Sequence, residues 1–246
     1  MSPYEGTTDV NVHQSETPGP SSTVITNPNE WYETSLLIPH EAIRDGLNRM
    51  EDVCANWGED RDWKLPSFLK WYKRYFYYFV HHHHAHEEEI FFPWIMTKVT
   101  EAPKKASEDH DTLLKTMDAI LEVKTADELK KLIPQFVQDV KEHLAEEEEW
   151  WPSVLKDHFS EEEEAAKVEI TVKALGLYGA KIGLPWIVTE MSNWAPHGFK
   201  EKFFGSLPPP LRLMYKWSWV VDYEKNNLGL LQSIKNDKEL RTWFWV

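Results

Sequence analysis

Apolar residues recur at steps of three and four in several stretches of the chain, and each such stretch predicts an amphipathic helix. The first lies between residues 35 and 57, and its inward positions are Ile43, Leu47, Met50 and Cys54. The second runs from about residue 66 to residue 100, with inward positions Tyr77, Val80, His84, Glu88 and Phe91. Pro93 lies inside this second stretch and should kink it, because proline removes one backbone donor.

The same pattern returns further along the chain. A third helix is predicted from 106 to 123, with inward positions His110, Leu113, Met117 and Ile120. A fourth begins after Thr125, where Thr-Ala-Asp-Glu is a capping box, and its inward positions are Ile133, Phe136, Val140, His143, Glu147, Trp150 and Val154. Ser160 opens another capping box and a short fifth helix, which is predicted to end near Gly176.

The third and fourth helices repeat the first and second. In each pair the first helix carries a lone histidine, and the second carries His-x-x-x-Glu followed by two aromatic residues and proline. Two such helical hairpins with short connections predict an all-α protein, an up-down-up-down four-helix bundle with approximate two-fold symmetry.

The regions outside the repeat differ in composition. Residues 1–30 are rich in Ser, Thr, Pro and Gly without a period, which predicts a disordered tail. Residues 31–176 are assigned to the bundle and its short fifth helix. Residues 177–246 are rich in Trp and Pro and are predicted to form a helical extension packed on the bundle.

The charge of the chain limits its partners. There are 27 Lys and Arg against 41 Asp and Glu, a formal net charge of -14. Such a surface repels phosphate and anionic lipid, so we expect neither nucleic acid nor a membrane as partner. The single cysteine, Cys54, excludes an internal disulfide, and neither a secretory signal nor a membrane-spanning run is visible. A cytoplasmic location is the expectation.

The repeated histidines and glutamates predict a dinuclear metal site. Residues four apart on a helix share a face, so each His-x-x-x-Glu pair offers an imidazole and a carboxylate to one point. The candidate ligands are His40, His84, Glu88, His110, His143 and Glu147. This donor set suits two Fe ions, with zinc or manganese as alternatives. If both glutamates bridge and each metal takes two histidines, an oxo or hydroxo bridge gives five ligands and leaves one octahedral position open.

Each motif also has a simpler interpretation. A lone inward histidine is usually an ordinary core residue, and a glutamate run is usually a solvated face. His82, His83 and His86 are expected to point away from the face of His84, whereas His81 could support a ligand or be a further one. The conjunction favours metal, because burying these groups without compensation would cost many kcal/mol. A ferritin-like carboxylate site is excluded, since no histidine has a glutamate three residues before it.

These motifs resemble the hemerythrin-like, or HHE cation-binding, family. The resemblance covers roughly residues 35 to 158 and rests on four blocks, His40-x-x-Ile43-Arg44, His84-x-x-x-Glu88 to Pro93, His110-Asp111-x-Leu113, and His143-x-x-x-Glu147 to Pro152. It implies a hemerythrin-type bundle and a non-haem di-iron centre with Glu88 and Glu147 bridging. Leu114 stands where the oxygen carriers have a further histidine, and Glu147 and Glu148 stand where they use one aspartate. A more open site favours sensing, storage or oxidative chemistry over reversible oxygen carriage.

Three functions remain open at this point. The first is a protein that binds iron and dioxygen, or another small oxidant, without turnover, and this is the reading we favour. The second is a di-iron enzyme that activates dioxygen or peroxide on a substrate admitted between the bundle and the C-terminal extension. The third is a structural zinc or metal-free bundle. A pocket that reaches the metals, with an acid or base at its mouth, would separate enzyme from carrier.

Overall fold

The computed structural model describes residues 25, 28–99 and 104–240. These residues form helices and no strand, so the predicted all-α class is confirmed. The predicted N-terminal tail falls almost wholly on residues outside this set. None of the helices in the described part of the chain combines the length and apolar character needed to cross a membrane.

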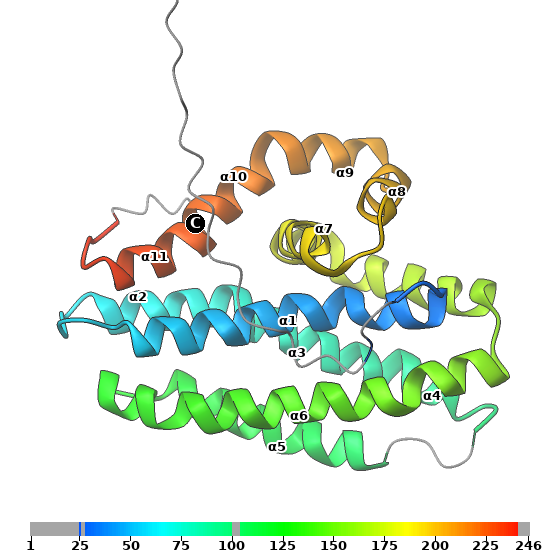
Figure 1. Cartoon of the computed structure of the whole chain (residues 1–246), viewed down its shortest axis with the longest axis horizontal. Coiled ribbons are helices and arrows are strands. Elements are labelled where there is room, and N and C mark those ends of the chain that lie inside the picture. Colours follow the sequence, from blue (N-terminus) through cyan, green and yellow to red (C-terminus); the bar gives the residue numbers. More distant parts are fainter. Residues whose placement is uncertain (1–24, 26–27, 100–103, 241–246) are drawn as a thin grey trace, which may run out of the picture.

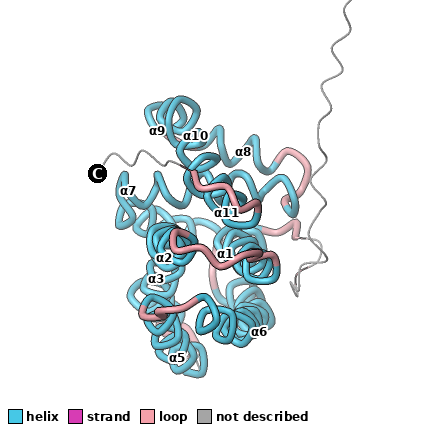
Figure 2. Tube along the Cα trace, turned by 90° about the vertical axis from the view of Figure 1, so that its left-hand side faces the viewer, coloured by secondary structure: helices cyan, strands magenta, loops and turns pink. Residues whose placement is uncertain are grey.

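Four long segments form the body of the protein. The first is α1 (Trp31–Ala55). The second consists of five consecutive elements, α2 (Lys64–Trp71), η1 (Tyr72–Tyr77), α3 (Tyr78–His86), η2 (Glu87–Phe91) and α4 (Phe92–Ile95). The third and fourth are α5 (Lys104–Leu121) and α6 (Ala126–His158). The segments η1 and η2 are π-helical, so that their backbone bonds reach one residue further than in an α-helix. Figures 1 and 2 show the four segments as roughly parallel rods grouped around a common interior.

Two helix starts predicted from capping boxes are confirmed. At the start of α6 the Glu128 N–H donates to Oγ1 of Thr125 at 3.2 Å. At the start of α7 (Glu161–Trp194) Ser160 and Glu163 cap each other reciprocally. The chain turns at Gly176, which has a φ of 60°, and a second helical stretch then continues to Trp194. The fifth helix is therefore longer than predicted, with a bend where the sequence indicated an end.

The interior consists of the apolar stripes of the four segments. Val80, Leu113, Ile120 and Val140 are among the buried residues that form the main core. Aromatic rings extend this core along η1, where Tyr72 stacks on Phe76 with 5.7 Å between centroids. Their burial supplies the main driving force for assembling the rods.

A close approach between three helices occurs at Gly46 of α1. A Cβ at this position would lie 2.6 Å from the Phe76 ring and 2.7 Å from the Trp186 ring of α7. Only glycine fits this contact without movement of both rings. Gly46 therefore lets α7 pack directly against the bundle.

The C-terminal residues pack on one side of the four rods. The helices are α8 (Phe199–Ser206), α9 (Pro209–Met214), η3 (Tyr215–Trp219), α10 (Val220–Tyr223), η4 (Glu224–Leu228) and α11 (Gly229–Lys235). Figure 2 shows them with α7 on the side of α1 and α2. Two indole N–H groups tie this layer to the bundle: Trp186 donates to Asp45 at 2.7 Å, and Trp71 donates to Asn227 at 2.8 Å.

Candidate metal centre

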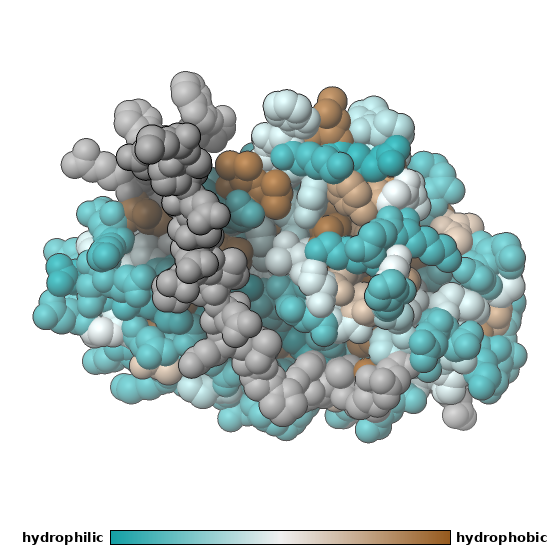
Figure 3. All heavy atoms as spheres, turned by 45° about the horizontal axis from the view of Figure 1, so that its top comes forward, coloured by the Kyte–Doolittle hydropathy of each residue, from teal (hydrophilic) through white to brown (hydrophobic). Residues whose placement is uncertain are grey.

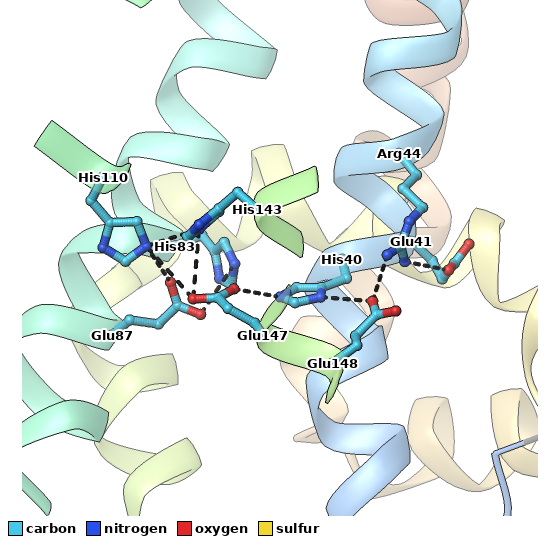
Figure 4. Close-up of polar contacts among 9 residues, drawn as sticks. All are labelled: His40, Glu41, Arg44, His83, Glu87, His110, His143, Glu147 and Glu148. Atoms are coloured by element: carbon cyan, nitrogen blue, oxygen red, sulfur yellow. Dashed lines mark hydrogen bonds and ion pairs between the residues drawn. The ribbon is translucent and has the colours of Figure 1, made fainter. Parts of the chain in front are cut away.

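Histidines from all four rods converge in the interior. His40 comes from α1, His83 and His84 from α3, His110 from α5 and His143 from α6. The side chain of His83 is 9% exposed, and the other four residues are no more exposed than that. Figure 4 shows four of these rings directed toward two glutamates that lie between them.

The first of these glutamates is Glu87, at the start of η2. Its Oε1 lies 3.3 Å from Nε2 of His83, and its Oε2 lies 3.4 Å from Nε2 of His110. One carboxylate thus directs its two oxygens at histidines from two different rods.

The second glutamate, Glu147 of α6, has the same arrangement. Its Oε2 lies 3.4 Å from Nε2 of His40. Its Oε1 lies 3.5 Å from Nε2 of His143 and 3.7 Å from Nε2 of His110. Glu87 and Glu147 therefore both lie between the same two sets of histidines.

The donor atoms fall into two compact groups. One group is His40, His83, Glu87 and Glu147, and the other is His84, His110 and His143; within each, the donor atoms lie within 4.8 Å of one another. Imidazole nitrogens and carboxylate oxygens in these numbers suit a borderline transition metal. The two groups could each hold a metal ion.

Unpaired buried atoms support this assignment. Nε2 of His40, of His83 and of His84 makes no hydrogen bond within the described chain, and neither does Oε2 of Glu87 nor either oxygen of Glu147. A buried polar atom without a partner costs roughly 1–3 kcal/mol, and these atoms all face the same two points. Metal ions at the two points would satisfy these atoms together. The residues present therefore fit a pair of bound metal ions.

Further carboxylates hold the outer nitrogens of two rings. His40 Nδ1 lies 2.9 Å from Oε1 of Glu148, and His110 Nδ1 lies 2.8 Å from Oε1 of Glu88. If each Nδ1–H donates to its carboxylate, Nε2 is left deprotonated, which is the form that binds a metal. Arg44 supports this arrangement on one side, because its Nη2 lies 2.7 Å from Oε1 of Glu148 and its Nη1 donates to Glu41 at 2.8 Å.

The electrostatics prepare several rings as neutral ligands. Burial, followed by the neighbouring histidines, lowers the pKa of His83 and His84 well below the ordinary value. Burial also lowers the pKa of His143. For His40 burial acts in the same direction, but the carboxylates of Glu147 and Glu148 outweigh it and raise the pKa. Neutral imidazole is the form that binds metal.

The pKa values of the buried glutamates are also shifted in different directions. Burial would raise the pKa of Glu147, but His143, His110 and His40 outweigh it and hold that pKa well below the usual range. For Glu148 burial is likewise outweighed, by His40 and Arg44, and the pKa is about 2. Burial and the charge of Glu147 instead raise the pKa of Glu87 well above the usual range. A cation between Glu87 and Glu147 would relieve their mutual repulsion.

The structure differs from the sequence prediction on α3 and η2. Glu88 does not share the inward face with His84: its side chain is 39% exposed and it contacts the outer nitrogen of His110. Glu87 occupies the inward position instead. His83, expected to point away, faces the centre together with His84. His81 lies outside both groups, with its ring stacked on Tyr77 at 5.7 Å.

The cause is the π-helical segment η2. The inward face passes from Glu87 to Phe92, five residues on, and the Phe92 N–H bonds to the Glu87 carbonyl across that extra residue. In α6 the same face passes from Glu147 to Trp151 in four residues. An alignment of the repeats on their prolines therefore places the glutamates one residue out of register. Alignment on Ala85 and Ala145 would have paired Glu87 with Glu147.

Residues 35–152 match the family model of the hemerythrin HHE cation-binding domain. The resemblance read from the sequence is thereby confirmed over this stretch. Such a domain implies cation binding, in agreement with the two groups of His and Glu. A search of curated proteins and a search of solved structures found no match for the chain.

Proposed function

We propose that this domain holds two iron ions and binds dioxygen or another small oxidant, as a protein that carries, senses or stores them. His40 and His83 would bind one ion, and His110 and His143 the other, with Glu87 and Glu147 bridging. His84 would be an additional ligand on the His110 side. We retain the up-down-up-down bundle of hemerythrin type as the frame for this site.

The proposal rests on one observation, that each of the two glutamates directs its two oxygens at histidines from both sets. Glu87 directs Oε1 at His83 and Oε2 at His110, and Glu147 directs Oε2 at His40 and Oε1 at His143. Two carboxylates that each face both histidine sets favour a dinuclear site over two separate mononuclear sites. A structural zinc site would be closed by four ligands and would not need such sharing.

The two sides of the site differ in donor number. Two histidines and two carboxylate oxygens face the His40 side, whereas His84 adds a third histidine on the His110 side. With octahedral preference, the His40 side has more room for an exogenous ligand. Iron bound there would supply an open position for a small oxidant.

The experiment is anaerobic reconstitution with Fe(II), followed by optical spectra before and after exposure to air. Absorption bands that develop in air and disappear under vacuum support a carrier, whereas bands that decay irreversibly support a sensor or an oxidase. The variant Glu147→Ala should lose the bands, and Glu149→Ala, a neighbouring exposed glutamate, should keep them. Protein that takes up only zinc, or no metal, would refute the proposal.

A second candidate is an oxygen-activating enzyme, and one observation favours it. His83 and Glu87 line a cavity between the bundle and the C-terminal helices. Turnover of an organic compound by the iron-loaded protein in air would separate this candidate from a carrier or sensor, and absence of turnover across a panel of small organic compounds would count against it.

A further inference from the structure

A cavity of about 240 Å³ lies between the bundle and the helices that follow it. One wall is formed by the first turns of α1 and by α3, another by α7, and the outer side by α8 and α9. Most of the side chains that line it are apolar, among them Leu36, Phe79, Leu175, Ile187, Leu207 and Leu211. Figure 3 shows hydrophobic residues, in brown and tan, on the face that carries the C-terminal helices.

The size and walls of the cavity suit a small organic molecule. An apolar cavity of about 150 Å³ stays dry and binds benzene, so this one has room for a larger molecule. Three of its helices, α7, α8 and α9, follow the matched domain in the chain, so residues outside that domain complete the cavity.

One end of the cavity belongs to the metal centre. His83 and Glu87, which face the side of the centre with fewer donors, are among the residues that line it. A molecule in the cavity would therefore lie beside that side of the centre.

The charges on the walls select against ions. No Lys or Arg is among the described residues that line the cavity, whereas Glu87 and Glu164 are. An anionic ligand would find no Lys or Arg there, and the apolar walls oppose any unpaired charge. Glu164 is buried, 6% exposed, and burial, opposed by a hydrogen bond with Ser35, raises its pKa to about 7. A protonated Glu164 can both donate and accept a hydrogen bond.

We propose that this cavity binds an uncharged, mostly hydrocarbon organic molecule, such as a medium-chain alcohol, in contact with His83 and Glu87. Glu164 provides a buried carboxyl group for the polar end of that molecule. The binding itself stands on the cavity, and only its position beside a metal ion rests on the proposed function.

The test uses N-phenyl-1-naphthylamine, an uncharged fluorophore that brightens in apolar surroundings, with the full chain in both metal-free and iron-loaded forms. Saturable binding is expected in both forms. In the metal-free form at pH 6, where Glu164 keeps its proton and octanoate is ionised, 1-octanol should displace the probe and octanoate should not. Failure of the probe to bind, or equal displacement by octanoate, would overturn the proposal.

A matched pair of variants locates the binding. Val172 lines the cavity and is 52% exposed, and Ile170 lies on the same helix, outside the lining, and is 48% exposed. Because a charge at the cavity wall must be desolvated when the probe binds, Val172→Asp should weaken binding about tenfold or more. Ile170→Asp should leave it within about twofold. Equal losses in the two variants would show that the probe binds the general apolar surface and would refute the proposal.

Two other occupants are distinguished in the same experiment. If sedimentation shows that Val172→Asp converts a dimer into a monomer, the cavity face is an interface between copies and the proposal fails. If the probe binds only after residues 1–24 are deleted, the chain itself fills the cavity, and the proposal fails again. Iron binding without probe binding refutes this inference alone, and probe binding without iron binding refutes the proposed function alone.

Discussion

The Nδ1 atom of His40 lies 2.9 Å from Oε1 of Glu148, so that consecutive glutamates hold the two edges of one imidazole ring. Glu148 fixes the ring from outside and Glu147 meets it at the centre. Because partners of this kind orient a metal-binding histidine and set its tautomer, they contribute to metal affinity without touching the metal.

Replacement of Glu148 by Gln should therefore weaken metal binding by roughly 10–100-fold. Competition with a chelator measures this change. The control is Glu149→Gln, an exposed neighbour in the same run, which should retain the wild-type affinity. Unchanged affinity in Glu148→Gln, even with a loss of stability through Arg44, would show that the contact does not orient His40.

Glu87 and Glu88 should give different results on substitution. Glu87 lies between His83 and His110, so Glu87→Gln should lose most of the bound metal. Glu88 contacts only the outer nitrogen of His110 among the histidines of the centre, so Glu88→Gln should keep the metal with reduced affinity. Metal content by mass spectrometry measures both. If Glu88→Gln lost more metal than Glu87→Gln, the result would support the register of an unbroken α-helix, with Glu88 at the centre.

Glu164 should make the stability of the protein depend on pH. Its pKa rises from an ordinary 4.5 to about 7 on folding, mainly by burial. The folded state thus binds more protons than the unfolded state between these values, and the free energy of unfolding falls as pH rises through this window. Across this window the free energy of unfolding falls by about 3 kcal/mol at most. Relative to wild type, Glu164→Gln should therefore gain stability between pH 5.5 and pH 8.

Urea unfolding at the two pH values measures this gain. The control is Glu163→Gln, because Glu163 is a partly exposed neighbour whose pKa is lowered by Lys98 and by the helix start. Its effect should not change between pH 5.5 and pH 8. A difference for Glu164→Gln that is independent of pH would contradict the burial of a neutral carboxyl group.

Gly46 should be intolerant of a side chain. A Cβ there would lie 2.6 Å from Phe76 and 2.7 Å from Trp186, so Gly46→Ala should destabilise the protein by roughly 1–3 kcal/mol. Gly205→Ala is the matched control, since a Cβ there meets no atom within 4 Å. Thermal unfolding compares the two. Equal stability of both variants would mean that α7 moves away from α1 at no cost.

The helices and their inward faces could be read from the sequence because tertiary packing follows the helical period. His40, His110, His143 and Glu147 were placed on inward stripes, and the structure brings all four together. On these segments the α-helical register is continuous from the core residues to the site. The capping boxes at Thr125 and Ser160 were equally readable, because they depend only on local hydrogen bonds.

The register of α3 and η2 could not be read in the same way. Runs of identical residues, the histidines from His81 to His84 and the glutamates from Glu87 to Glu89, leave the phase undetermined by residue type. The π-helical segment then adds one residue before Pro93. The cavity was also beyond the sequence, because its walls come from helices whose packing on the bundle is set by contacts distant in the chain.

In the proposed site Glu87 and Glu147 would bridge two metal ions. The most direct measurement is the number of iron ions per chain after anaerobic reconstitution and removal of loosely bound metal. Two ions are expected in the wild type, and Glu147→Ala should lose both together, not one. One ion per chain, or a variant that retains one ion at full occupancy, would contradict a shared carboxylate bridge.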